Sequence, residues 1–371
     1  MHAAITSTGE IIYANNLTQG NIDEIVYCPT CQQALIYKVS SNGKGFFSHL
    51  TSCQKDFQPR MTQESQTHLS AKILLKDNLQ ASGYSAHIEY PIEDAQQIAD
   101  LYVINPNSVT PYQIIEFQKV PIRAELIRVR TQAYLEIVDK CTWFIDEEIF
   151  NTGYRQTWLQ TMATYSSRLG FHWQVLNVDK QEWVIKFKMP VMFQPHRVQL
   201  CEKRFNLEKP LDSVWESPSD HLKKGVHYSF YRRPQGQSTY FKQLKQIMTQ
   251  ATYQKAIRAL YSEGILLQTL PQWMVIEKWQ FLVCKSPGWQ CLAWAYYLVE
   301  QFGLESFTTT ELENGFKRLI EEGRFKLAVM PLVSADLVSL FVDSLLDKFI
   351  EKEIIFADGY QRWKGNSKDI D

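Results

Sequence analysis

The sequence lacks a long hydrophobic segment, both at its start and elsewhere. Met1–Gly20 has no basic start and no continuous apolar stretch, so it does not predict a signal peptide. The longest apolar tract, Leu327–Leu346, is interrupted by Pro331, Asp336 and Asp343, which argues against a membrane span. We therefore expect no membrane partner.

The sequence also lacks an excess of charge of either sign. Its 39 Lys and Arg residues and 40 Asp and Glu residues give a net charge of −1. Such a chain has no overall attraction to nucleic acid, so any DNA binding must come from local patches. The chain contains no repeat and no low-complexity segment, and its 371 residues suffice for two or three domains.

The seven cysteines are odd in number and unevenly spaced, which favours thiols and metal ligation over a disulfide framework. Cys28-Pro-Thr-Cys31 is followed by His49 and then by Cys53. These soft ligands have the type and spacing of tetrahedral structural zinc sites, which leave no open position for a substrate. The alternative is four unrelated residues. We favour zinc, in a zinc-finger-like module over residues 1–58.

Beyond this module the chain predicts the order helix, three strands, helix, strand. A helix is expected from about Thr62 to Gln80. Strands are expected over Tyr84–Ile92, Gln97–Ile104 and Tyr112–Val120, followed by a strand over Cys141–Ile145. The sequence therefore predicts an α/β domain.

Between the third and fourth strands, apolar residues recur at steps of four and three. The core-facing stripe of this amphipathic helix would consist of Ile122, Leu126, Val129, Ala133 and Ile137. Beyond about Glu148 the pattern changes. Residues 151–235 are mixed and aromatic-rich, with a strand expected over Gln181–Lys188, and Tyr240–Phe356 reads as mostly helices.

Two of the apolar strands each place a carboxylate where a core residue is expected, namely Asp100 and Glu116. An ionised group in a dry strand is costly unless it is paired or binds a metal. Because side chains alternate along a strand, Glu116 and Gln118 should face the same way. Carboxylates on neighbouring strands could hold Mg²⁺, which can activate a water and relieve charge at a phosphate. The arrangement is one residue away from the Asp…Glu-x-Lys pattern of metal-dependent phosphodiesterases.

The two predicted helices add further polar residues. Glu64 begins the first helix, and His68 and Lys72 follow on the same face, where they could complete the site from above the sheet. On the second helix Arg130 and Tyr134 are one turn apart and could hold a phosphate.

Each of these residues also has a purely structural interpretation. Asp100 could be half-exposed on an edge strand, and Glu64 could simply favour the helix macrodipole. The pair that follows Glu64 could lie on a solvated face, and the pair on the second helix could bracket the apolar stripe. The ordered set favours a site because several independent features converge.

With these motifs together, the chain resembles the CoiA-like competence proteins, a family of the PD-(D/E)xK nuclease superfamily. The features that carry the resemblance are the Cys-x2-Cys…His module, the segment Glu64–Lys72, Ala99-Asp100, Ile115–Gln118, Arg130-x3-Tyr134 and Trp143–Ile145. The resemblance implies a restriction-endonuclease-like αβββαβ core over residues 59–150. Residues 151–371 would form a mixed and then mainly helical C-terminal domain.

The resemblance implies a cytoplasmic protein that acts on incoming single-stranded DNA in natural transformation and recombination, alongside the recombinase. By motif position it assigns Asp100, Glu116 and Gln118 to a catalytic site, with Mg or Mn at the two carboxylates. Glu64 would contribute from the helix, and we add His68 as a further catalytic candidate. Lys72 would bind DNA, together with the pair on the second helix.

Two departures from the family pattern weaken the expectation of catalysis, although not that of the fold. Gln118 replaces the superfamily lysine and cannot supply a positive charge, although a shifted Lys or Arg could compensate. Gln96-Gln97 precede Ile98 where the family often has an arginine.

A second candidate surface is the basic and aromatic segment His221–Arg233. Its cations, Lys223, Lys224, Arg232 and Arg233, could follow a phosphate backbone while the aromatic rings stack on unpaired bases. An ordinary surface strand or loop is the alternative, which the sequence favours slightly.

Three functions remain open at this point. The leading hypothesis is a metal-dependent DNase, and the second is a non-catalytic DNA-binding recombination mediator that keeps a decayed nuclease fold. Placement of Asp100 and Glu116 on opposite faces of the sheet would favour the second. The third is a zinc-stabilised scaffold that binds only proteins, which an absence of salt-sensitive DNA binding would favour.

Overall fold

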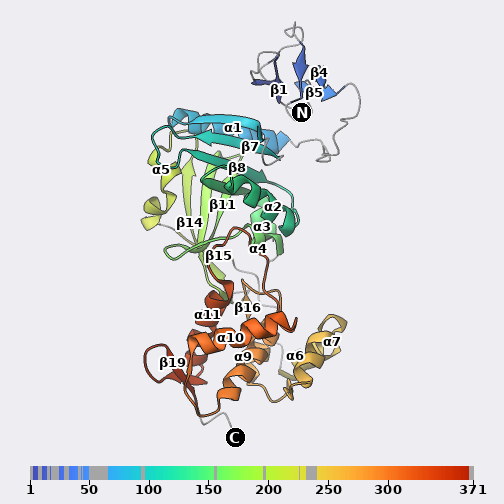
Figure 1. Cartoon of the computed structure of the whole chain (residues 1–371), viewed down its shortest axis with the longest axis vertical. Helices are drawn as coiled ribbons and strands as arrows, with labels where there is room; N and C mark the ends of the chain where they lie inside the picture. Colours follow the sequence, from blue (N-terminus) through green and yellow to red (C-terminus); the bar gives the residue numbers. More distant parts are fainter. Residues whose placement is uncertain are drawn as a thin grey trace.

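A computed structural model of the chain describes most of its residues in three parts that follow one another along the long axis (Figure 1). The described residues are 3–6, 11–14, 17, 25–28, 33–40, 43, 45–49, 66–92, 97–153, 157–194, 198–224, 226–230 and 240–366. In these ranges no helix is both long enough and apolar enough to cross a membrane.

The N-terminal part is a five-stranded antiparallel sheet. Its strands are β1 (Ala3–Ile5), β2 (Ile11–Tyr13), β3 (Val26–Tyr27), β4 (Ala34–Val39) and β5 (Gly45–His49), in the order β2-β1-β3-β4-β5. Its buried core is small and is made by Ala4, Ala14, Val26, Cys28, Leu35 and Phe47. So small a core can contribute only part of the stability that a separate module needs.

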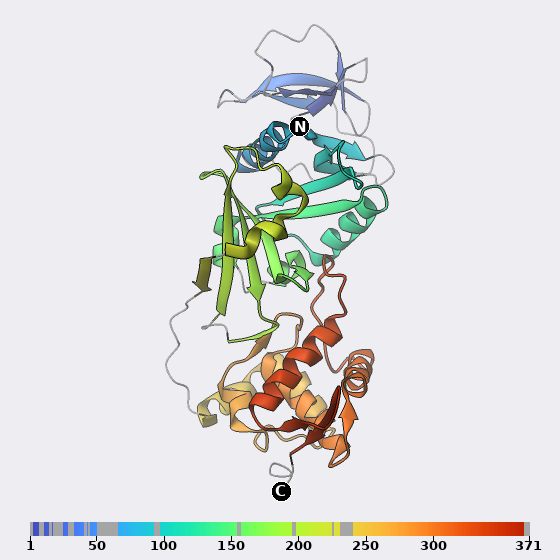
Figure 2. The same ribbon diagram turned by 90° about the vertical axis from the view of Figure 1, so that its left-hand side faces the viewer.

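The middle part has the predicted αβββαβ order. Its elements are α1 (Gln66–Ala81), β6 (Ser85–Ile92), β7 (Gln97–Ile104), β8 (Tyr112–Gln118), α2 (Ala124–Leu135) and β9 (Lys140–Asp146). The strands β6, β7 and β8 pair antiparallel, and β8 pairs parallel to β9. Leu75 and Leu79 of α1 share one core with Ile115 and Phe117 of β8. Figures 1 and 2 show α1 and α2 on opposite sides of this sheet.

The same sheet continues past residue 150, where the sequence placed a domain boundary. The added elements are α3 (Glu147–Gly153), α4 (Thr157–Met162), β10 (Thr164–Ser166), β11 (Gly170–Asn177), β12 (Glu182–Met189), β14 (Val198–Asn206), α5 (Ser213–Glu216), the 3-10 helix η2 (Pro218–Lys224) and β15 (Val226–Phe230). Strand β11 pairs parallel to β9, which gives the order β15-β14-β12-β11-β9-β8-β7-β6. The change in composition near residue 150 therefore marks a crossover through two short helices within one sheet.

Polar contacts also fasten the later segment to the first helix. The Asn78 side chain of α1 donates to the carbonyls of Leu207 and Lys209, each across 2.7 Å. The Trp215 indole donates to Oδ1 of Asn78 across 2.9 Å. Residues near 207–215 thus form part of the same folded unit as α1.

Helix α2 buries a different face from the one that its periodicity predicted. The buried residues are Ile127, Thr131 and Tyr134, while Leu126 and Val129 of the predicted core stripe are exposed. Tyr134 turns inward because its hydroxyl pairs with Glu116, and the Trp143 indole donates to the Thr131 hydroxyl. Polar pairing to buried groups of the sheet therefore sets the rotation of α2, and the apolar stripe follows from it.

The C-terminal part is mainly helical, as expected. Its helices are α6 (Tyr240–Thr249), η3 (Ala251–Tyr253), α7 (Gln254–Tyr261), α8 (Gln272–Ile276), α9 (Gly288–Phe302), α10 (Thr309–Glu321) and α11 (Leu337–Glu351). Two small sheets join β13 (Met192–Phe193) to β16 (Gln280–Phe281), and β17 (Phe307–Thr308) to β19 (Arg362–Gly365) and β18 (Ile355–Ala357). Strand β13 directly follows the middle sheet, so its pairing with β16 ties the two parts together.

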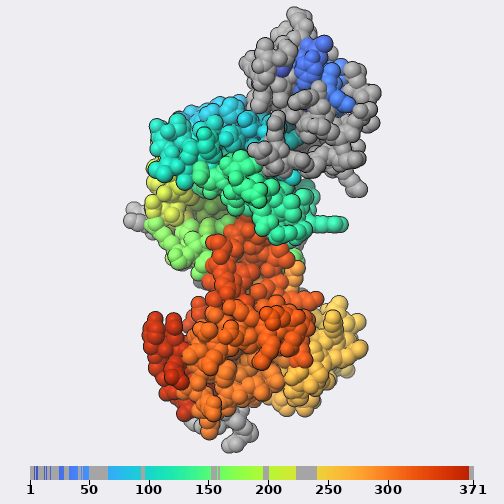
Figure 3. Space-filling view, viewed as in Figure 1, coloured from blue at the N-terminus to red at the C-terminus, as the bar shows by residue number. Residues whose placement is uncertain are grey.

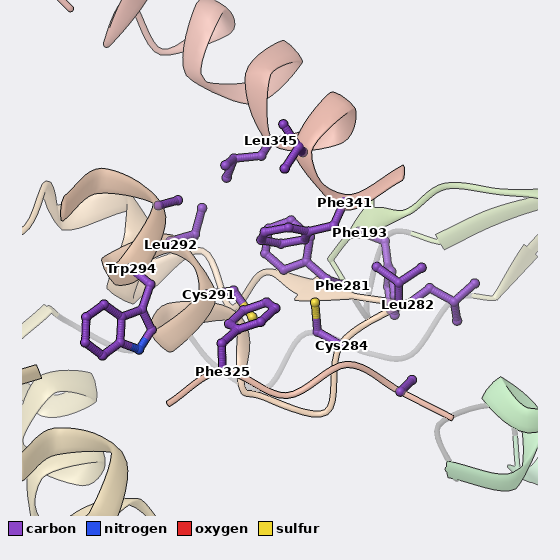
Figure 4. Packing of buried hydrophobic residues seen from close by; sticks show 14 of the residues in the cluster. Phe193, Phe281, Leu282, Cys284, Cys291, Leu292, Trp294, Phe325, Phe341 and Leu345 are labelled. Atoms are coloured by element: carbon purple, nitrogen blue, oxygen red, sulfur yellow. The ribbon is translucent and has the colours of Figure 1, made fainter. Parts of the chain in front are cut away.

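Close ring packing fills the centre of the helical part (Figure 4). Phe341 makes edge contacts with Phe281 and Phe316, each with ring centroids 4.8 Å apart. Cys284 and Cys291 lie in the same core as free thiols. Burial raises the pKa of Cys284, which fits an inert packing role for this thiol.

Candidate active site at the fork between two strands

The second and third strands of the middle sheet separate where the two predicted carboxylates lie. The register of β7 and β8 ends at Leu101 opposite Ile115. Beyond this pair, Oδ2 of Asp100 accepts a hydrogen bond from the backbone N–H of Phe117 across 2.8 Å. The Asp100 carboxylate thus spans the gap between the strands. We call this point, formed by Asp100, Glu116 and Phe117, the fork.

Asp100 turns toward α1 because strand alternation shifts by one residue at the fork. Its Oδ2 accepts a second hydrogen bond, from Nε2 of His68 on α1, across 3.0 Å. On β6, the consecutive residues Ile88 and Glu89 both face α1, since Ile88 lies in the α1 core and Glu89 pairs with Lys72. Glu89 has a φ of 53°, a left-handed conformation that costs energy in a residue with a side chain.

Lys72 lies inside the site and not on a solvated face. Its side chain is 2% exposed, and its ammonium donates to Oε1 of Glu89 across 2.9 Å. This burial rejects the solvated-face interpretation of Lys72. A direct contact with a DNA backbone also needs an exposed ammonium, so the position favours a role within the site over one in DNA binding.

Glu116 faces α2 and is completely buried. Its Oε1 accepts hydrogen bonds from Nη2 of Arg130 and from the Tyr134 hydroxyl, each across 2.7 Å. Arg130 also donates to the carbonyl of Ile98 on β7 across 3.1 Å, and its guanidinium lies over the Trp143 ring. The Arg130–Tyr134 pair therefore closes the fork from the α2 side.

The surroundings drive the two carboxyl groups apart in acidity. Burial alone would raise the pKa of Asp100, but the hydrogen bond and charge of His68, the charge of Lys72 and the Phe117 N–H lower it to about 2. Burial raises the pKa of Glu116 to about 7, with a further contribution from the Asp100 charge and an opposing one from Arg130. Divergent acidities in neighbouring carboxyls are typical of functional sites.

The structure brings Asp100 and Glu116 together at the fork, but their partners approach from opposite sides of the sheet. Asp100 is held from α1 and Glu116 from α2. Their backbones are nevertheless adjacent, because the N–H that binds Asp100 belongs to the residue after Glu116, about 2.4 Å from the Glu116 Cα. This arrangement corrects the expectation of a site on one face of the sheet.

The donor set at the fork suits a hard divalent cation. Among the described residues, no atom forms a hydrogen bond with Oε2 of Glu116, which is buried, so one carboxylate oxygen has no partner. No group of three or more His, Cys, Asp or Glu side chains in those ranges is arranged to hold a metal ion. Mg²⁺ is commonly held by only one or two carboxylates together with waters and phosphate oxygens. Glu64 lies outside the described residues.

Gln118 is followed by a lysine that reaches the other side of the fork. The Lys119 ammonium donates to the Thr67 hydroxyl of α1 across 2.9 Å, and Thr67 precedes His68. Alternation directs Gln118 to the Glu116 side and Lys119 to the Asp100 side. A cation is therefore present one residue beyond the position where the superfamily pattern has it.

The sequence missed two residues of this site, Lys119 and Glu89. Lys119 carried a usable signal, because it directly follows Gln118 at the end of a predicted strand. Glu89 carried none, since its contact with Lys72 depends on a backbone conformation that the strand pattern does not predict.

The predicted zinc ligands are only partly described. Cys28 is buried just beyond β3, and His49 ends β5. Leu35 pairs with both Val26 and His49, so the register brings Cys28 and His49 to the same end of the sheet. The other two predicted ligands, Cys31 and Cys53, lie outside the described residues, and zinc binding stays a prediction.

The basic segment is described only in part. The backbones of Lys223 and Lys224 end η2, and Arg232 and Arg233 lie outside the described residues. Its DNA-binding role therefore stays a prediction.

Comparison with known proteins places the fork inside a defined domain. Residues 64–212 match a family model described as the nuclease-like domain of competence protein CoiA. The match begins at Glu64 and ends in the segment that Asn78 fastens to α1, so it covers α1 and the sheet as far as β14. Neither the curated proteins nor the solved structures gave a match.

Proposed function

Because residues 64–212 belong to the CoiA family of nuclease-like competence domains, we propose that this chain is a divalent-metal-dependent DNA nuclease. It would act in the cytoplasm on incoming single-stranded DNA and on recombination intermediates during natural transformation, alongside the recombinase. One observation carries the catalytic part: two carboxylates meet at the fork, and Oε2 of Glu116 is buried without a hydrogen-bond partner among the described residues.

Asp100 and Glu116 are the residues that would hold Mg²⁺ or Mn²⁺. When bound, such an ion supplies an activated water and offsets charge on the phosphate. Asp100 is kept ionised by its hydrogen bonds and by nearby cations, so it offers a carboxylate at any working pH. Arg130 and Tyr134 fix the orientation of Glu116 through Oε1 and leave Oε2 unpaired.

Two other groups at the fork have roles that fit their positions. His68 is 27% exposed and is oriented by Asp100, so it can exchange a proton with a water or a leaving group. Lys119 is half-buried at the mouth of the same side, where its ammonium can bind a phosphate oxygen. Both groups reach the site from the α1 side.

A second function is supported by specific features of the same site. Arg130 already places a positive charge 2.7 Å from Glu116, Gln118 is neutral, and Asp100 and Glu116 are held from opposite sides of the sheet. A fork neutralised by its own arginine suits a DNA-binding recombination mediator that needs no ion and cleaves nothing.

Cleavage assays on the full-length chain separate these functions. End-labelled single- and double-stranded DNA would be incubated with wild type, Asp100→Asn and Glu116→Gln in Mg²⁺, Mn²⁺ or EDTA. A nuclease should lose about 100-fold or more of its rate in both variants and all of it in EDTA. Glu125→Gln, which removes an exposed carboxylate from α2, is the matched control and should cleave normally.

The mediator is the correct assignment if wild type binds single strands in EDTA but cleaves no DNA with either metal. Equal cleavage by wild type and Asp100→Asn would remove the fork from the reaction altogether.

A further inference from the structure

The outer side of α2 carries an apolar stripe at helical spacing. Its residues, which we call the α2 stripe, are Ile122, Leu126, Val129, Ala133 and Ile137. Leu126 is 47% exposed, Val129 is 45% exposed, and Ile137 is also exposed. Single exposed apolar residues are common on protein surfaces, but a repeating row of them is typical of a contact surface.

The α2 stripe is separate from the face that α2 packs against its own sheet. The inward residues are Ile127, Thr131 and Tyr134. Successive residues of an α-helix are about 100° apart, so the stripe through Leu126 lies roughly a quarter turn from the face through Ile127. The helix therefore has two apolar faces, and intramolecular packing buries only the inner one.

The α2 stripe is complementary to itself when two copies run antiparallel. If Leu126 lies opposite Ala133 of a second copy, the same register sets Ile122 opposite Ile137, a large residue opposite a small one and an apolar end opposite an apolar end. Val129 then lies beside the two-fold axis. Every such contact occurs twice, because both copies present the same surface.

The charges that flank the α2 stripe fit the same register. Arg123 precedes the helix and Glu136 caps its C-terminal end, and both are exposed. In the antiparallel pair Arg123 of each copy faces Glu136 of the other. A parallel pair would instead bring like charges together at both ends, so the charge pattern selects the antiparallel arrangement.

We propose that the α2 stripe is a dimerisation surface and that its occupant is the α2 stripe of a second copy of this chain. The green segment that contains α2 lies at the surface of the middle part (Figure 3). One helix pair falls below the roughly 1,200 Å² of stable interfaces, so the dimer is weak, with a dissociation constant in the micromolar range.

The dimer places two forks back to back across one helix pair. The inner face of each α2 holds Glu116 through Arg130 and Tyr134, so the helix that positions the carboxylate also forms the contact. The proposal does not rest on nuclease activity, because a DNA-binding mediator would dimerise through the same surface.

Sedimentation velocity of the full-length chain, between about 1 and 100 µM, tests this proposal. Wild type should shift from monomer to dimer across this range, and the double variant Leu126→Glu/Val129→Glu should stay monomeric. Leu304→Glu is the matched control, because it adds the same charge at a leucine that is 60% exposed in the C-terminal part. It should dimerise as wild type does.

A charge reversal tests the register. Arg123→Glu should weaken the dimer roughly fivefold or more, because two ion pairs become repulsions. The double variant Arg123→Glu/Glu136→Arg restores opposite charges at both ends and should return to within about threefold of wild type. A monomeric wild type at 100 µM, or a dimer that survives Leu126→Glu/Val129→Glu, overturns the surface. Failure of the double charge reversal overturns the antiparallel register.

Discussion

Arg130 donates to Glu116 across 2.7 Å, and this carboxylate has no exposed surface. The contact joins α2 to the centre of the sheet and places a cation at one oxygen of the carboxyl group. The other oxygen has no hydrogen-bond partner among the described residues, so the neutralisation of Glu116 is incomplete. A proton or a bound cation can complete it, which makes the site sensitive to pH and to metal.

The stability of the protein should therefore fall between pH 5 and pH 8 through Glu116. Its pKa is raised from 4.5 to about 7 on folding, so the folded state binds the proton more tightly than the unfolded state does. Stabilisation from this proton is complete below about pH 4.5 and is lost as the pH rises through 7, with a limit of about 3 kcal/mol. Asp100, with its pKa lowered to about 2, loses stabilisation only below this window.

Urea unfolding at pH 5 and pH 8 measures this effect. In Glu116→Gln the difference in unfolding free energy between the two pH values should shrink by most of that amount, whereas Glu125→Gln should keep it. A Glu116→Gln variant with the same pH dependence as wild type would show that Glu116 stays ionised in the folded protein.

A second prediction concerns the cation beside Gln118. Lys119→Gln should lower cleavage by about tenfold or more, because it removes the ammonium at the mouth of the α1 side. The swapped variant Gln118→Lys/Lys119→Gln should regain activity if a lysine at position 118 can serve the site. Gln118→Lys alone should raise activity above wild type.

Steady-state cleavage of single-stranded DNA at saturating metal measures these rates. Lys140→Gln, which changes a lysine of β9 away from the fork, is the control. Equal rates in wild type and Lys119→Gln would assign the compensating charge to another residue.

The sequence predicted the order and the approximate bounds of the core elements because hydrophobic periodicity is a local property. It placed β7 over Gln97–Ile104 and found the helix that became α2. It did not predict the rotation of α2, because that depends on the pairing of Tyr134 with a buried carboxylate. It also ended the domain near residue 150, because the pairing of β11 with β9 is a long-range contact with no local signal.

The candidate site divides in the same way. Asp100, Glu116 and Gln118 were visible as polar residues in apolar strands, and His68 followed from helical spacing. The shift in alternation at Glu89, which turns Asp100 toward α1, was not visible, because strand patterns assume regular alternation. The separation of the two carboxylates onto opposite sides follows from this single irregularity.

A third prediction tests whether the Lys72–Glu89 pair serves the site or only the fold. Lys72→Met and Glu89→Gln should each destabilise the protein by roughly 3 kcal/mol or more, because each leaves one buried charge unpaired. The double variant Lys72→Met/Glu89→Gln removes both charges and should recover most of the stability. If Lys72 supplies charge to the fork, the double variant should be folded yet impaired in cleavage.

Thermal unfolding and cleavage rates of the three variants decide the matter. Full recovery of cleavage along with stability in the double variant would make the pair purely structural. Lys76→Met, one turn further along α1, is the control and should cleave as wild type does.

A fourth prediction concerns the basic segment. Replacing Lys223, Lys224, Arg232 and Arg233 together by alanine should weaken binding to single-stranded DNA and flatten its dependence on salt. Each lost phosphate contact lowers the slope of log K against log salt by about 0.7 on single strands. Fluorescence anisotropy across a series of salt concentrations measures the slope, and an unchanged slope would move the binding surface to the nuclease-like domain.

The last prediction is that the N-terminal module binds one structural zinc ion through Cys28, Cys31, His49 and Cys53. The buried core of this sheet is small, and its register brings Cys28 and His49 to the same end, so a metal there would join β3 to β5. Binding of a structural zinc can contribute about 10 kcal/mol or more to the folding of so small a unit. Purified protein should therefore contain about one zinc per chain.

Cys28→Ser should lose the zinc and make residues 1–58 sensitive to protease while the nuclease-like domain stays folded, because that domain has its own core. Cys201→Ser, which changes a buried cysteine of β14, should keep the zinc. Metal analysis by mass spectrometry and limited proteolysis read out the two effects. A metal-free chain whose N-terminal module resists protease as the zinc-loaded chain does would rule the zinc site out.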